Sequence, residues 1–218
     1  MTNLVDLIEA GIDTCPHGAP LWIDLSSRKG RADWLPDEFF CRPVFGSDGM
    51  AWTSATLRAI DAVDVRGTIV ADIGAGTGIL GFHALARGAT HVHAVDSDPL
   101  ARAVAGMNAR LLGESERFTV HAAVGDVARS TGCAFVHLWG VWDLPPVLPA
   151  VADRLPTGAR LILAPLERTG ELAQIEGTCR DLGLAPTRAS ECEGWYALEV
   201  RIAAAGRPLT PISPREGR

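Results

Sequence analysis

The chain has 218 residues, 47% of them hydrophobic and 21% charged, a balance typical of one α/β domain with its own core. A net charge of −6 argues against a nucleic-acid partner, whose broad binding surface would need a basic face. No apolar run approaches the roughly 18 residues of a membrane helix. Acids stand near the N-terminus where a signal peptide would carry basic residues, so we expect a cytoplasmic protein with no membrane partner. The sequence leaves the oligomeric state open between a monomer and a homodimer.

From about residue 66 the chain alternates between strand-like and helix-like segments. Strands are expected at 68–73, 91–96, 118–123, 133–138, 159–164, 187–191 and 195–203, and helices at 77–87, 98–112, 146–155 and 169–183. This alternation predicts an α/β fold with a Rossmann-like, doubly wound, seven-strand sheet. The sheet should be mostly parallel, with an antiparallel hairpin at one edge because no helix separates the last two strands.

The ends of the chain differ from this central part. Residues 1–52 hold an expected helix at 1–11 and a stretch rich in proline, glycine and aromatic residues, and we interpret them as a short cap on the substrate side of the sheet. A helix expected at 53–63 leads into the cofactor-binding domain, 53–205. The tail, 206–218, is rich in proline and glycine and is expected to be disordered.

No metal site is expected. The five cysteines are widely spaced and form no C-x-x-C pair, so they predict free thiols. His91 and His93 lie two residues apart on an expected strand and share one face of it, which we interpret as packing or edge solvation.

The stretch "VADIGAGTGILG" offers two glycine fingerprints. Gly76, Gly78 and Gly81 spell G-x-G-x-x-G, which is typical of dinucleotide sites, whereas Gly74, Gly76 and Gly78 spell G-x-G-x-G. The strand is expected to end at Ile73, and a nucleotide-binding turn should begin at once after its strand. The second pattern therefore fits better.

Acids at the ends of three successive strands sharpen this interpretation. Asp72, just before the turn, would repel a pyrophosphate but suits the ammonium group of S-adenosylmethionine. Asp96, 22 residues after Gly74, suits two ribose hydroxyls, and Asp126 can reach an adenine amino group. Together they favour a sulfonium nucleoside over a dinucleotide.

The segment "ADIGAGTGILGFHALARGATHVHAVDSDPLARAVAGMNARLLG" resembles the cofactor-binding half of class I S-adenosylmethionine-dependent methyltransferases. It is most similar to the bacterial family that methylates lysine in a large-subunit ribosomal protein, with some likeness to the protein arginine methyltransferases. The resemblance covers about residues 45–203, including a partial match of "FGSDGMAWTSAT" to the family's cofactor-covering loop. It implies a cofactor site formed by Asp72, Gly74, Ala75, Gly76, Thr77, Gly78, Asp96, Ser97, Asp126, Val127, Leu138 and Thr53.

Two departures leave the acceptor open. The family carries a separate substrate-recruiting domain, for which the N-terminal segment is too short, and an asparagine motif after the fourth strand, where this chain reads "HLWGVWD" with Leu138 in the asparagine's place. The catalytic candidates are His137, Trp139 and Asp143. His137 could be a base or a packed strand residue, and an acceptor pocket could be lined by Trp52, Trp139 and Trp142.

The sequence thus predicts methyl transfer from S-adenosylmethionine to a small-molecule or peptide acceptor, with nitrogen preferred over oxygen. In-line displacement at a methyl sulfonium depends mainly on alignment of the reacting atoms, so few catalytic residues need be visible in the sequence. Three alternatives remain: a displacement that releases methylthioadenosine, an NAD(P)-dependent oxidoreductase, and a binding module without catalysis.

Overall fold

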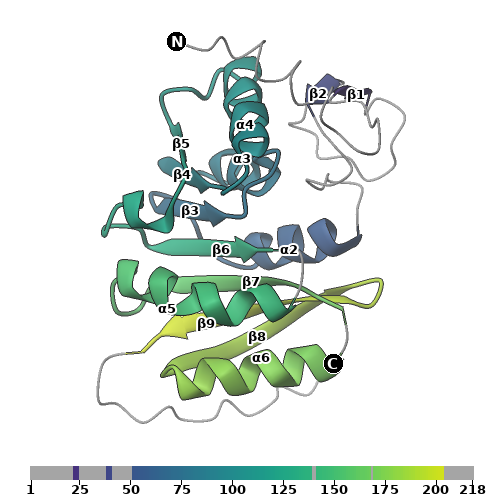
Figure 1. The fold of residues 1–218 in the computed structure, drawn as a ribbon, viewed down its shortest axis with the longest axis vertical. Coiled ribbons are helices and arrows are strands. Elements are labelled where there is room, and N and C mark those ends of the chain that lie inside the picture. The colour runs from purple at the N-terminus through teal and green to yellow at the C-terminus, as the bar shows by residue number, and fades with distance from the viewer. Residues whose placement is uncertain (1–21, 25–37, 41–50, 139–140, 168, 204–218) are drawn as a thin grey trace.

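The computed structural model describes residues 22–24, 38–40, 51–138, 141–167 and 169–203 (Figure 1). The helix expected at 1–11, the tail at 206–218 and the Trp139 side chain lie outside the described residues. None of the helices within these ranges is long and apolar enough to cross a membrane.

Seven strands form one sheet in the order β5-β4-β3-β6-β7-β9-β8. They are β3 (Ile69–Ile73), β4 (His91–Val95), β5 (Phe118–His121), β6 (Cys133–His137), β7 (Arg160–Leu166), β8 (Leu184–Cys192) and β9 (Trp195–Ile202). The first five pair in parallel, and β9 pairs antiparallel with both β7 and β8. The predicted Rossmann-like sheet with an antiparallel edge hairpin is confirmed.

Within the described residues, five α-helices cover the two faces of the sheet: α2 (Ala51–Asp61), α3 (Ile79–Ala86), α4 (Pro99–Leu111), α5 (Leu144–Arg154) and α6 (Thr169–Asp181). Helices α2, α3 and α4 share one buried cluster with strand residues such as Val70 and Phe135. Helices α5 and α6 share a second cluster with the alternate residues, such as Ala71 and Val136. Since strand side chains alternate between faces, Asp72 and His137 belong to the face of α2, α3 and α4.

Several local features differ from the expectation, among them the start of β8 at Leu184 rather than at 187. Residues Trp22–Asp24 and Glu38–Phe40 form a short antiparallel pair, β1 and β2, inside the stretch rich in proline, glycine and aromatic residues, where no strand was expected. Helix α5 begins at Leu144 rather than at 146, because a proline in the first helical turn lacks only an N–H that has no partner in the helix.

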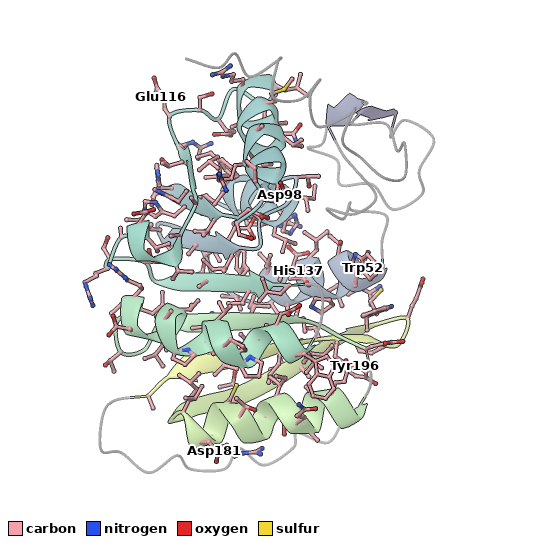
Figure 2. The ribbon with its side chains drawn as sticks, in the orientation of Figure 1. Trp52, Asp98, Glu116, His137, Asp181 and Tyr196 are labelled. Carbon is pink, nitrogen blue, oxygen red and sulfur yellow. The ribbon has the colours of Figure 1, made fainter. Side chains whose placement is uncertain are left out.

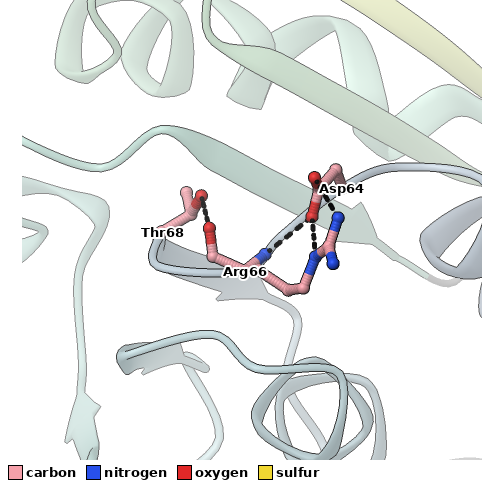
Figure 3. A network of polar contacts seen from close by, with 3 residues as sticks. All are labelled: Asp64, Arg66 and Thr68. Atoms are coloured by element: carbon pink, nitrogen blue, oxygen red, sulfur yellow. Dashed lines mark hydrogen bonds and ion pairs between the residues drawn. The ribbon is translucent and has the colours of Figure 1, made fainter.

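The turn from α2 into β3 is built on an exposed ion pair (Figure 3). The Arg66 guanidinium donates from Nε and from a terminal nitrogen to the two oxygens of Asp64, each at 2.9 Å. These hydrogen bonds lower the pKa of Asp64 to about 2. The turn lies where the parallel strands begin, at the edge opposite the glycine turn, so we assign it a structural role.

Candidate functional site

The glycine turn lies where the strand order reverses. Strand β3 is flanked by β4 on one side and by β6 on the other, and the chain leaves β3 after Ile73, as the sequence predicted. In open α/β sheets ligands bind beyond the carboxyl ends of the strands at such a point. An open depression of about 600 Å³ beside Asp61, Arg66 and Arg87 lies at the other edge and is not this site.

The turn has a backbone that only glycine adopts easily. Gly74, Gly76 and Gly78 have φ angles of 77°, 53° and 84°. At Gly74 a Cβ atom would lie 2.2 Å from the carbonyl oxygen of His137, so the end of β6 closes against the turn. The backbone N–H groups of Gly74 and Ala75 donate to the Val95 carbonyl at 2.8 and 3.1 Å, which fixes the turn to the end of β4.

Asp72 is fully buried beneath this turn. Its Oδ2 accepts a hydrogen bond from the Gly81 amide at 2.9 Å, whereas Oδ1 is buried without a hydrogen-bond partner among the described residues. Burial, with a smaller contribution from the charge of Asp96, raises the pKa of Asp72 to about 7, and the Gly81 hydrogen bond opposes this rise. A buried carboxylate in this state would be stabilised by a cationic ligand.

Asp96 follows β4 and joins the turn to the next helix. Its Oδ2 accepts from the Gly76 amide and its Oδ1 from the Asp98 amide, each at 2.9 Å. A carboxylate can accept about four hydrogen bonds, so lone pairs remain for ligand hydroxyls. Behind the turn, the buried Asn108 donates from Nδ2 to the Thr77 carbonyl at 2.9 Å, which ties α4 to the turn.

The residues present fit S-adenosylmethionine on two structural observations. Two buried polar atoms at the turn have no partner in the described part of the chain, Asp72 Oδ1 and Thr77 Oγ1. In addition, the turn is a backbone cradle that a side chain at Gly74 would fill. Asp72 could hold the ammonium group, Asp96 the ribose hydroxyls, and the turn the backbone of the methionine part.

The other predicted cofactor residues lie on the surrounding elements. Asp126 is exposed at the end of the 3-10 helix η2 (Val124–Asp126), and Val127 beside it is buried. Ser97 is exposed after β4, Thr53 is buried in α2, and the half-buried Leu138 follows β6. Their contact with a cofactor stays a prediction.

The end of β6 and the loop after it carry the predicted catalytic residues, at the same edge of the sheet as the glycine turn. His137 ends β6 beside the glycine turn, and burial lowers the pKa of its imidazole to about 4. Trp142 is 74% exposed, and Asp143 is exposed just before α5. Both belong to the 3-10 helix η3 (Val141–Asp143), so an aromatic side chain is available there to an acceptor.

Trp52 has a packing partner on the edge hairpin. Its ring meets Trp195 edge to face, with the ring centroids 5.3 Å apart and an interplanar angle of 87°. Figure 2 labels Trp52 on α2, the helix whose Thr56 contacts His137. The predicted contact of Trp52 with an acceptor therefore has to coexist with this ring pair.

Two residues at the site escaped the sequence analysis, Thr56 and Asn108. Both are fully buried polar residues on otherwise apolar helix faces, between Ala55 and Ala59 in α2 and beside Ala105 and Ala109 in α4. A polar residue within a helical stripe of apolar ones was the signal available. Buried polar groups need partners, so such positions indicate hydrogen bonds.

The histidines of β4 each contact a side chain of the neighbouring strand β5. His93 Nδ1 lies 2.9 Å from His121 Nε2, and His91 Nε2 lies 2.9 Å from Thr119 Oγ1. Across the described ranges, no three metal-ligating side chains are arranged to hold an ion.

Known proteins resemble this chain most clearly around the turn. The model of the family "Ribosomal protein L11 methyltransferase (PrmA)" matches residues 44–134. The ribosomal protein L11 methyltransferase of Symbiobacterium thermophilum is 30% identical over 179 residues, which cover 82% of this chain and 57% of that protein. The enzyme of the same name from Methylococcus capsulatus is 32% identical over 166 residues, covering 75% and 54%. The chain thus spans just over half the length of these relatives.

A solved structure shares the fold. The ribosomal protein L11 methylase of Lactobacillus delbrueckii subsp. bulgaricus superposes with a TM-score of 0.63 at 21% identity, covering 70% of this chain and 79% of that one. An RNA methyltransferase of Salinibacter ruber, solved with S-adenosyl-L-homocysteine, gives 0.56 at 16% identity, covering 71% and 94%. At these identities the likeness concerns the fold alone.

Proposed function

We propose that this chain, a class I S-adenosylmethionine-dependent methyltransferase related to the ribosomal protein L11 methyltransferases, methylates a nitrogen atom of a protein acceptor. The observation that carries the donor part of the proposal is the buried Asp72 with one unpartnered oxygen beneath the glycine turn. This arrangement suits the cationic methionine end of the donor and would repel a pyrophosphate. In the proposed division of the chain, 53–205 binds the donor and 1–52 contributes to the acceptor side.

S-adenosylmethionine supplies the methyl group: the acceptor lone pair forms the new bond to carbon, and the carbon–sulfur pair stays on sulfur as S-adenosylhomocysteine leaves. With the donor bound, Asp72 would hold its ammonium group and Asp96 its ribose, and Asp96 also accepts a hydrogen bond from the Gly76 amide. Such contacts would orient the donor toward the acceptor, and alignment of this kind supplies much of the rate in such displacements. The amine proton is released to water.

A protein acceptor is supported by the names of the relatives, which are ribosomal protein L11 methyltransferases. The exposed Trp142 beside the end of β6 gives such an acceptor a surface to contact. An exposed aromatic ring suits a lysine or arginine side chain, because a cation is attracted to the ring face. A small-molecule acceptor is the competing outcome.

The test is a methylation assay with labelled S-adenosylmethionine and two acceptor pools. We expect label in the ribosomal-protein fraction of a bacterial extract, an N-methyl residue by mass spectrometry, and release of S-adenosylhomocysteine. Label confined to the low-molecular-weight fraction would overturn the protein acceptor but keep methyl transfer. Release of methylthioadenosine would overturn methyl transfer itself. The label transferred by a Gly74→Ala variant, in which the new side chain fills the cofactor cradle, gives the background of the assay.

A further inference from the structure

His137 meets α2 on the side of the sheet that also carries Asp72. It is the last residue of β6, and its backbone carbonyl faces Gly74 of the turn. Its Nδ1 lies 3.3 Å from the hydroxyl oxygen of Thr56 in the middle of α2. Figure 2 shows the His137 side chain beside this helix. The imidazole therefore has a defined neighbour at one ring nitrogen.

The position of the Thr56 hydroxyl hydrogen determines which of Thr56 and His137 is the donor in this contact. Thr56 Oγ1 donates to the carbonyl of Trp52, four residues earlier, at 3.1 Å. A hydroxyl has a single hydrogen, so with this bond made the oxygen can only accept from the imidazole. His137 Nδ1 must then carry a proton and donate it to Thr56.

The charge state of His137 determines whether its other ring nitrogen, Nε2, carries a proton. Burial lowers the pKa of His137 to about 4, so the imidazole is neutral at physiological pH. A neutral imidazole with a proton on Nδ1 has a lone pair on Nε2. No hydrogen bond joins Nε2 to any residue of the described ranges. This nitrogen is available as an acceptor.

We propose that Thr56 is a positioning residue for methyl transfer, holding His137 in the Nδ1–H tautomer so that Nε2 accepts a hydrogen bond from the N–H of the acceptor. This inference rests on the proposed function. The hydrogen bond to Nε2 turns the acceptor lone pair toward the methyl carbon. It thereby selects an acceptor atom that carries a hydrogen, as a primary or secondary amine does.

The tautomer can be observed without any activity. We expect ¹⁵N long-range NMR spectra of the chain to show His137 with a protonated Nδ1 and an unprotonated Nε2; its signals, among those of six histidines, are assigned by their loss in His137→Gln. Thr56→Val, which removes the hydroxyl at nearly constant volume, shifts the proton toward Nε2, and Thr56→Ser keeps the wild-type pattern. A wild type with its proton on Nε2, or a Thr56→Val spectrum like the wild type, overturns the proposal.

The kinetic consequence is measured with S-adenosylmethionine and the ribosomal-protein fraction. Thr56→Val should lower the rate of S-adenosylhomocysteine release by about tenfold, a modest share of a typical acid–base contribution, with its melting temperature and its affinity for S-adenosylhomocysteine unchanged. Thr56→Ser should restore most of the rate. An unchanged rate in Thr56→Val overturns the positioning role. If the wild type itself releases no S-adenosylhomocysteine, the proposed function fails together with that role, and the spectra still decide the tautomer.

Discussion

The glycine turn after β3 and the loop after β6 are neighbours at one edge of the sheet, yet they are built differently. The turn is fixed by its own backbone, by the Val95 carbonyl and by two strand-end acids. The loop presents side chains, among them an exposed Trp142 and a His137 held by Thr56. On the proposed function, the donor would be recognised by the backbone shape of the turn. The acceptor would be recognised by side chains of the loop, such as Trp142.

The largest expected effect comes from closing the backbone cradle. In Gly74→Ala the new Cβ would lie 2.2 Å from the His137 carbonyl, so the turn or the end of β6 must move. We expect at least about a hundredfold loss of affinity for S-adenosylhomocysteine, measured by calorimetry, because the ligand contacts depend on this turn.

Gly113→Ala is the matched control for backbone strain. Gly113 also has a positive φ of 71°, but a Cβ there would meet nothing within 4 Å. The substitution should cost about 1 kcal/mol of unfolding free energy and leave binding unchanged. Equal loss of affinity in both variants would mean that strain, and not closure of the cradle, explains the result.

The second effect concerns the charge of Asp72. Asp72→Asn removes the negative charge that would face the ammonium group and should weaken binding of S-adenosylhomocysteine by at least about tenfold, as loss of a charge-assisted hydrogen bond does. The same variant should raise the melting temperature at pH 8, since the free chain no longer buries a carboxylate. A higher melting temperature together with weaker binding in Asp72→Asn would identify Asp72 as a ligand-binding acid. If Asp72 were a structural acid, the substitution would lower both the melting temperature and the affinity.

The pH dependence follows from the same group. Burial raises the pKa of Asp72 from 3.8 to about 7, so between these values the native chain holds a proton that the unfolded chain has released. The contribution of Asp72 to the free energy of unfolding therefore falls as pH rises through this window. Affinity for the cationic ligand should instead rise with pH, by up to about tenfold per unit below pH 7. Asp72→Asn should flatten both profiles, and an unchanged affinity profile in this variant would contradict the assignment.

Sequence reasoning placed the glycine turn and its two acids because their signals are local. Positive φ angles demand glycine, and strand ends are visible in the hydrophobic pattern, so the turn and Asp72 and Asp96 could be placed from the sequence. Thr56 and Asn108 could not, since their roles depend on contacts with residues 81 and 31 positions away. The short β1–β2 pair was missed because three-residue strands leave almost no periodic pattern.

The smallest effect tests the acceptor side. Trp142→Ala should leave the melting temperature and the affinity for S-adenosylhomocysteine unchanged, because the side chain is 74% exposed. It should raise the KM for the protein acceptor about three- to tenfold, as loss of one aromatic contact would. As a control, Leu111→Ala removes an exposed apolar side chain from α4. It should leave the melting temperature, the affinity for S-adenosylhomocysteine and the KM unchanged. An unchanged KM in Trp142→Ala would show that Trp142 does not contact the acceptor.

The most direct test of the donor assignment is a calorimetric titration of the wild-type chain with S-adenosylhomocysteine and, separately, with NAD⁺. Both ligands contain an adenosine, but only S-adenosylhomocysteine carries an ammonium group for Asp72, and only NAD⁺ carries a pyrophosphate that this carboxylate would repel. We predict one S-adenosylhomocysteine bound per chain and no heat from NAD⁺. Binding of NAD⁺, or no binding of S-adenosylhomocysteine, would contradict the assignment of the glycine turn to a methyl donor.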